Sequence, residues 1–333
     1  MTPQLQAAPR RLGSGPSVFP IALGCMGMSG AYGPADERES IATIHAALDQ
    51  GITLLDTGDY YNAGHNELLI ARALEGRAGR ALLSVKFGAL RAPDGAWLGI
   101  DLRPAAVKNF VGYSLTRLRV DHIDIYRPGR SDPNVPIEET MGAITELIAA
   151  GYVRDVGLSE VGADTLRRAH AVHPVADLQI EYSLISRGPE AKIFPAVAEF
   201  GVGVTAYGVL SRGLLAGSST AGKGDFRGHL PRFSGANLEQ NRRVVETLGR
   251  LAAEHGCTAS QLAIAWVLAK GDNIVPVIGA RTRKQLSEAL GALDVKLSRG
   301  DLATIETAIP PETVAGARYD ERQMRILDSE RSS

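Results

Sequence analysis

Short apolar runs alternate with longer amphipathic stretches along most of the chain. The run Ile52–Leu55 is rich in apolar and β-branched side chains, whereas the stretch 66–74 carries apolar residues at helical spacing. This pair of patterns recurs eight times. We therefore predict strands at 21–23, 52–55, 81–87, 123–126, 153–158, 178–182, 202–207 and 274–278. We predict helices at 40–50, 66–74, 103–118, 137–150, 163–172, 192–200, 261–270 and 285–290.

Strands separated by helices pair in parallel, because a helical crossover returns the chain to the same edge of the sheet. Eight such units predict an α/β fold, a (β/α)8 TIM barrel with an N-terminal β-hairpin and extra C-terminal helices. No Pro/Gly/Ser linker divides the sequence, so residues 1–333 are interpreted as one domain. Within it, 10–20 is predicted to form the hairpin below the barrel, 217–237 a polar mobile loop and 312–333 a charged tail.

The overall charge excludes one class of partner. The 36 Lys and Arg residues nearly balance the 37 Asp and Glu residues, which gives a net charge of −1 and no basic footprint for nucleic acid. The longest apolar run, 262–269, is too short to span a bilayer, so no membrane association is expected. The N-terminus has no apolar stretch behind its arginines, and Cys25 and Cys257 suit a reducing compartment, so a cytoplasmic location is expected.

Common nucleotide and metal motifs are missing from the sequence. It contains neither G-x-G-x-x-G nor the phosphate-binding G-x-x-x-x-G-K-[ST] motif. The stretch Gly157–Val161 lacks the final glycine of a nucleophile elbow. The seven histidines form no H-E-x-x-H or H-x-H pattern, so we expect no catalytic metal.

Polar residues gather where the predicted strands end, and this is the end of a barrel that carries its active site. Asp56 and Tyr61 follow the second strand, and Lys86 lies at the end of the third. An ammonium beside a phenol lowers the pKa of the phenol from about 10, and a carboxylate orients the ammonium. Together they predict a tyrosine that can give or take a proton. Alternatively, Asp56 caps a turn and Lys86 reaches for water.

The last strand–helix junction carries three basic side chains in the stretch Arg281–Lys284. A helix N-terminus with three cations attracts a phosphate, and barrels often bind phosphate at this junction. An ordinary basic surface turn is the competing interpretation.

Several of these residues occur together in one known family. The sequence resembles the aldo-keto reductase superfamily from about Leu12 to Ile309, and its spacing is most similar to the longer-chain bacterial members and the potassium-channel β-subunit-like branch. The resemblance rests on Asp56-Thr57-Gly58-Asp59-Tyr60-Tyr61, Asn66-Glu67, Lys86, Asp132-Pro133 with Pro136, Gly157-Leu158-Ser159-Glu160, Gln179-x-Glu181-Tyr182-Ser183 and Gly279-Ala280-Arg281.

The resemblance implies a barrel that binds NADPH/NADP⁺ without a Rossmann motif. Tyr61 would be the proton donor, Lys86 would lower its pKa, and Asp56 would pair with Lys86. Ser159 and Gln179 match positions that bind the nicotinamide carboxamide, and Tyr207 matches the aromatic residue that stacks on the ring. The other implied cofactor-binding positions are Gly24, Cys25, Met26, Gly208, Leu210, Arg212, Gly213, Gly279, Arg281, Gln285 and Glu288.

Two positions depart from the family pattern. Gly129 stands where the family has a histidine that donates a hydrogen bond to the substrate oxygen, and Ala289 replaces an asparagine of the adenine site. The glycine removes a donor and is expected to open space for a bulky or ring-bearing carbonyl compound. A water molecule or Arg130 could supply part of the missing function.

The leading hypothesis is therefore an NADPH-dependent reductase of an aldehyde or ketone. The loss of the histidine also motivates an NADPH-binding sensor with little turnover. A third interpretation is a barrel aldolase that uses Lys86 as a Schiff base. Trp97, after the third strand, could line the substrate pocket or merely cover it. The sequence specifies neither the small-molecule substrate nor the oligomeric state.

Overall fold

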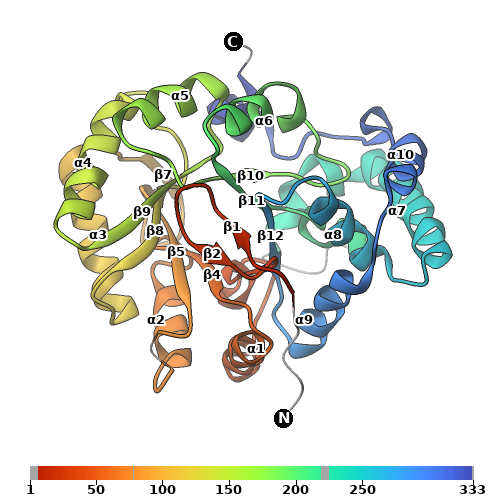
Figure 1. Ribbon diagram of the computed structural model, residues 1–333, viewed down its shortest axis with the longest axis horizontal. Coiled ribbons are helices and arrows are strands. Elements are labelled where there is room, and N and C mark those ends of the chain that lie inside the picture. Colours follow the sequence, from red (N-terminus) through yellow and green to blue (C-terminus); the bar gives the residue numbers. More distant parts are fainter. Residues whose placement is uncertain (1–6, 78, 219–224, 332–333) are drawn as a thin grey trace.

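The computed structural model describes residues 7–77, 79–218 and 225–331, which build a closed barrel of parallel strands (Figure 1). Each strand pairs with the next in chain order, and the last closes on the first. The predicted TIM barrel is confirmed. Its strands are β3 (Ala22–Gly24), β4 (Leu54–Gly58), β5 (Leu82–Phe87), β8 (Ile123–Pro128), β9 (Val153–Ser159), β10 (Asp177–Glu181), β11 (Gly203–Tyr207) and β12 (Ile274–Gly279).

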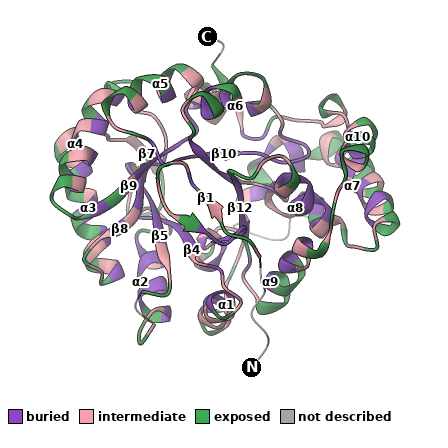
Figure 2. Cartoon of the chain, in the orientation of Figure 1, coloured by how far each residue is buried: buried purple, intermediate pink, exposed green. Residues whose placement is uncertain are grey.

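A ring of helices covers the barrel, with buried faces toward the strands and exposed faces outward (Figure 2). Local sequence explains where several begin: Asp36, Thr258 and Thr282 each cap a helix by accepting backbone N–H groups. The ring comprises α1 (Glu37–Asp49), α2 (His65–Ala73), α3 (Pro104–Leu118), α4 (Ile137–Ala149), α5 (Ala163–Val172), α6 (Pro189–Glu199), α8 (Ala259–Ala269) and α9 (Arg283–Leu290).

The predicted N-terminal hairpin closes one end of the barrel. It consists of β1 (Arg10–Arg11) and β2 (Ser17–Val18), and Leu12 in its turn is fully buried. Gly13 follows at φ 53°, and a Cβ there would lie 2.4 Å from the carbonyl oxygen of Ala176, just before β10. A glycine is therefore needed for the hairpin to press against the N-terminal ends of the strands.

The insertion between β11 and α8 contains a long helix that the sequence analysis did not predict. This helix, α7 (Gly235–Glu254), buries a narrow stripe formed by Asn241, Val244, Leu248, Leu251 and Ala252. Residues 219–224 of the predicted mobile loop lie outside the described residues. The described part forms the short helices η2 (Ser211–Ala216), η3 (Phe226–His229) and η4 (Pro231–Phe233) and the start of α7.

Two further segments decorate the barrel. A hairpin of β6 (Ala89–Arg91) and β7 (Trp97–Ile100) follows β5 and was not predicted. At the other end of the chain, η5 (Gly291–Asp294), α10 (Arg299–Ala308), η6 (Pro311–Thr313), α11 (Glu321–Ile326) and η7 (Asp328–Glu330) provide the extra C-terminal helices. The described part of the tail predicted at 312–333, up to residue 331, packs against the barrel, as the burial of Tyr319 and Leu327 shows.

No helix in the described ranges is both long and apolar enough to cross a membrane.

Candidate active site

A buried ion pair forms the floor of the barrel mouth. Lys86 Nζ donates to Asp56 Oδ1 at 2.5 Å, across the paired strands β4 and β5. The second oxygen, Oδ2, accepts hydrogen bonds of 2.8 Å from Ser84 and from Gln179. Burial opposes the charged carboxylate, but the cations Lys86 and Arg127 outweigh it and hold the pKa of Asp56 below its usual value. Asp56 and Lys86, from adjacent strands, therefore meet, and their catalytic roles stay a prediction.

Tyr60 and Tyr61 lie in the turn after β4, above this pair. The Tyr61 amide donates to the Gly58 carbonyl, and the Lys86 ammonium stands 5.1 Å from the centre of the Tyr61 ring. The two rings meet edge to face, with centroids 5.1 Å apart. Neither hydroxyl has a hydrogen-bond partner among the described residues, and both side chains keep partial access to solvent.

The expected acidity of Tyr61 was wrong for this geometry. Burial, followed by the neighbouring Tyr60 and the charge of Asp56, raises the pKa of Tyr61 well above its usual value. The physical reason is the position of Lys86, which gives its hydrogen bond to Asp56 and faces the ring of Tyr61. The phenol therefore stays protonated at neutral pH.

Asn66 ties the tyrosine-bearing turn to the end of the first barrel strand. Its amide donates to the Cys25 carbonyl and to Ser29 Oγ, each at 2.8 Å, and it accepts from Thr57 Oγ1 at 2.6 Å. Cys25 and Met26 follow Gly24, the last residue of β3, which pairs with both Asp56 and Gly279. These three predicted cofactor positions thus adjoin the ion pair.

Ser159 and Tyr207 end the strands β9 and β11, and Gln179 lies in the middle of β10 between them. Ser159 pairs in register with Gln179, and both are buried. The Gln179 amide nitrogen donates toward Asp56, while its Oε1 has no donor among the described residues. The Tyr207 hydroxyl donates to Glu160 at 2.7 Å and lies 3.0 Å from that of Tyr319. The strand ends therefore leave an amide oxygen available for a ligand donor.

The turn after β11 has an unusual backbone. Gly208, Ser211, Arg212 and Gly213 all have positive φ, from 45° to 93°; Leu210 lies between them. The Ser211 hydroxyl is buried and has no partner in the described ranges. A strained turn with an unpaired buried donor at a strand end is typical of a ligand-binding segment.

The β12–α9 junction presents the predicted phosphate-binding cation. One Arg281 nitrogen, Nη1, donates to the Tyr32 carbonyl at 3.0 Å. The Arg281 amide donates to Gln285 Oε1 at 2.8 Å, which fixes the first turn of α9. Glu288 instead accepts from Thr258 at the start of α8, so its predicted adenine contact competes with a helix-cap contact.

Arg318 and Tyr319, from the C-terminal segment, cover the opposite side of the mouth. Arg318 donates to both carboxylate oxygens of Glu160, at 2.9 and 2.5 Å. Tyr319 packs beneath the guanidinium of Arg212, which lies 4.5 Å from its ring centre and pairs with Glu181 at 3.0 Å. The mouth is thus bounded by arginines and carboxylates from distant parts of the chain.

The comparisons with known proteins agree with this geometry. A model of the aldo/keto reductase family matches residues 20–310. The chain belongs to this family. A probable aldo-keto reductase 1 of Glycine max is 41% identical over 325 residues, covering 95% of this chain and 93% of that protein.

Solved structures of other aldo-keto reductases show the same architecture. A glycerol dehydrogenase of Gluconobacter oxydans matches with a TM-score of 0.81 and 31% sequence identity. The match covers 91% of this chain and 96% of the dehydrogenase chain. An aldo-keto reductase of Bacillus halodurans, in its holo form, matches with a TM-score of 0.77 and 28% sequence identity. The match covers 96% of this chain and 100% of the reductase chain. The protein is therefore an oxidoreductase-type enzyme with an aldo/keto reductase barrel.

Two buried ion pairs of this aldo/keto reductase were not predicted from the sequence. Arg127 is fully buried in the barrel and pairs with Asp177 at 2.8 Å. The only sequence signal was a charged residue within a predicted strand. The Arg318–Glu160 pair had no signal, because its partners stand 158 positions apart.

Trp97 contacts its own hairpin. It lies in β7, and the guanidinium of Arg91 stands 5.3 Å from its ring centre. Its proposed role in the substrate pocket stays a prediction.

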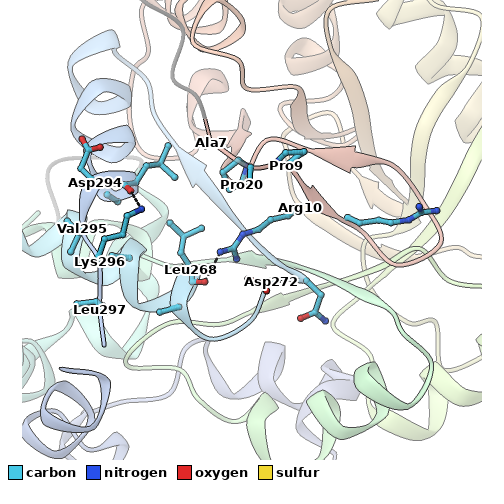
Figure 3. Close-up of a pocket in the computed structure, with 17 residues that line it drawn as sticks. Ala7, Pro9, Arg10, Pro20, Leu268, Asp272, Asp294, Val295, Lys296 and Leu297 are labelled. Carbon is cyan, nitrogen blue, oxygen red and sulfur yellow. Dashed lines mark hydrogen bonds between the residues drawn. The ribbon is translucent and has the colours of Figure 1, made fainter. Parts of the chain in front are cut away.

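A separate groove of about 950 Å³ opens at the other end of the barrel (Figure 3). Arg10 reaches into it and donates to the carbonyls of Leu268, Gly271 and Ile274. These contacts join the hairpin to the C-terminal end of α8 and to the start of β12, so a structural role accounts for the arginine. The groove lies at the N-terminal ends of the strands, away from the ion pair.

Proposed function

We propose that the protein reduces an aldehyde or ketone to an alcohol with NADPH. The observation that carries this proposal is the buried Asp56–Lys86 pair with Tyr61 above it. Bound NADPH supplies the hydride. Tyr61 donates its proton to the carbonyl oxygen, and Lys86 stabilises the phenolate that results. Asp56 keeps Lys86 charged, which matters because burial lowers the pKa of the lysine.

The residues at the mouth fit the cofactor. The free Oε1 of Gln179 can accept a hydrogen bond from the nicotinamide carboxamide. The buried Ser159 hydroxyl can donate one to it. The ring of Tyr207 can stack on the nicotinamide, and the unpaired Ser211 hydroxyl lies in the turn proposed to hold the pyrophosphate. Arg281 supplies a cation for the 2′-phosphate, which NADPH carries and NADH lacks.

The decisive experiment is the Tyr61→Phe variant. We expect its kcat for aldehyde-dependent NADPH oxidation to fall at least ~10²-fold, because the proton donor is gone. The dissociation constant for NADPH, measured by fluorescence titration, should stay within about twofold. Turnover would be followed by NADPH absorbance over a panel of aldehydes, ketones and quinones.

The Tyr113→Phe variant is the matched control, because that tyrosine is 56% exposed on α3. Its kcat should equal that of the wild type. Undiminished turnover by Tyr61→Phe contradicts the proton-donor assignment.

A second candidate is an NADPH-binding sensor with little turnover. It is favoured by the glycine at position 129 and by the C-terminal segment, whose Tyr319 contacts the Tyr207 hydroxyl. Tight NADPH binding by the wild type, without multiple turnover on any member of the panel, would select the sensor. The two free cysteines support a cytoplasmic location for either activity.

A further inference from the structure

Gly129 replaces the family's histidine, so the proposed substrate oxygen lacks one hydrogen-bond donor. We propose that the hydroxyl of Tyr60 supplies that donor, so that two adjacent tyrosines hold the carbonyl oxygen. This inference rests on the proposed reductase function and names a second catalytic residue for it.

The position of Tyr60 is the first observation. A Cβ placed on Gly129 would lie 2.7 Å from Tyr60 Oη, 3.2 Å from Cε1 and 3.3 Å from Cζ. The Gly129 amide donates to the Phe87 carbonyl at 2.8 Å, so the backbone there is fixed by the barrel. The phenol of Tyr60 thus fills the space in which a side chain at 129 would begin. The expected open space at Gly129 was wrong for this reason.

The two phenol rings also lie against the same residue, Gly58. A Cβ placed on Gly58 would lie 3.3 Å from Tyr61 Cζ and 3.4 Å from Tyr60 Cζ. Both phenol ends therefore face the same side of the turn. Their hydroxyls have no partner among the described residues, and both rings remain partly accessible. Two unpaired donors on adjacent rings, one of them facing a buried ammonium, form a site for an oxygen that gains negative charge.

Arg130 is the alternative donor, and its contacts argue against it. Its Nη1 donates to the Gly129 carbonyl at 2.6 Å and its Nη2 donates to the Tyr319 hydroxyl at 3.2 Å. The guanidinium is therefore directed along the rim of the mouth. Its positive charge lies near Tyr60 and favours negative charge there.

The test is a set of variants at positions 60 and 129, with folding checked by thermal unfolding. Tyr60→Phe removes only the hydroxyl. We expect kcat to fall roughly 10²–10³-fold, by analogy with the loss of one oxyanion donor. The NADPH dissociation constant should not change. A Tyr60→Phe variant with wild-type kcat and KM on every substrate overturns the inference.

Rescue by histidine separates a donor from a merely structural residue. Gly129→His in the wild type should lower both kcat and the unfolding temperature, because its Cβ meets Tyr60 Oη. In the Tyr60→Phe background, the Cβ of Gly129→His no longer meets the Tyr60 hydroxyl oxygen, and its imidazole restores a hydrogen-bond donor. We expect the double variant to recover at least ~10-fold in kcat over Tyr60→Phe.

The outcomes distinguish the two proposals. A wild type without turnover on the whole panel overturns the proposed reductase function. An active wild type whose Tyr60→Phe loss is not recovered by Gly129→His overturns only the role of Tyr60 as a donor. Recovery by Gly129→His but not by Gly129→Ala supports it.

Discussion

At the scale of single residues, the candidate active site depends on how its buried charges are paired. The Asp56 carboxylate receives three donors, from Lys86, Ser84 and Gln179. Ser84 in turn accepts from Arg127, which links the ion pair at the mouth to a second pair deeper in the barrel. A change in the deeper pair should therefore affect both stability and the position of Asp56.

Arg127→Met tests this deeper pair. Both Arg127 and Asp177 are fully buried, so removal of the cation leaves an uncompensated carboxylate. We expect the free energy of unfolding, from urea titration, to fall by about 3–5 kcal/mol.

Arg242→Met is the control, because Arg242 pairs with Glu239 on the exposed face of α7. Its effect should be below ~1 kcal/mol. Equal effects of the two substitutions would contradict the importance of burial for the Arg127 pair.

At the scale of elements, the β12–α9 junction is predicted to select the cofactor. Arg281 uses Nη1 for the loop carbonyl of Tyr32, and its other guanidinium nitrogens have no partner in the described part of the chain. Arg281→Ala should raise the NADPH dissociation constant roughly 10–100-fold and leave that for NADH unchanged, because only NADPH carries a 2′-phosphate. Fluorescence titration with both nucleotides measures this difference.

Arg283→Ala is the matched control on the same helix. Its guanidinium is already engaged by Glu39 on α1. The affinity for NADPH should therefore change little. A similar loss of affinity for NADPH and NADH in Arg281→Ala would argue against the phosphate contact.

The C-terminal segment is expected to respond to acid through Glu160. Burial opposes its charge, but Arg318 outweighs burial and lowers the pKa of Glu160 from 4.5 to about 2. Because the folded pKa is depressed, this stabilisation is complete above about pH 4.5 and is lost as the pH falls toward 2. Glu160→Gln should lower the unfolding temperature at pH 7 by roughly 5 °C.

The temperature gap between wild type and Glu160→Gln should shrink as the pH falls below about 4.5. Glu239→Gln, on the exposed face of α7, should show no such gap at any pH. If the difference in unfolding temperature stays constant from pH 7 to pH 3, the ionised Glu160 is not the source of this stabilisation.

At the scale of the whole molecule, periodicity predicted the barrel because each strand and helix has its own local pattern. Asp56, Tyr61 and Lys86 were predicted to lie together because parallel strands end at one edge. The α7 helix was missed because its buried stripe is narrow within a polar sequence. Arg318 and Tyr319 could not be placed, because their position depends on how the C-terminal segment folds back. Tyr60 was overlooked because only the three-dimensional path of the backbone brings it to Gly129.

The two described ends of the chain lie at opposite poles of the barrel. Arg10 anchors the N-terminal hairpin at the closed base, whereas Asp328 and Ser329 hydrogen-bond the backbone at Gly162 and Glu160 beside the mouth. A label attached to this hairpin would therefore lie away from the chemistry. A label attached beside Asp328 would instead lie next to the entrance, so fluorescent or immobilised versions of this enzyme should carry the label on the hairpin side.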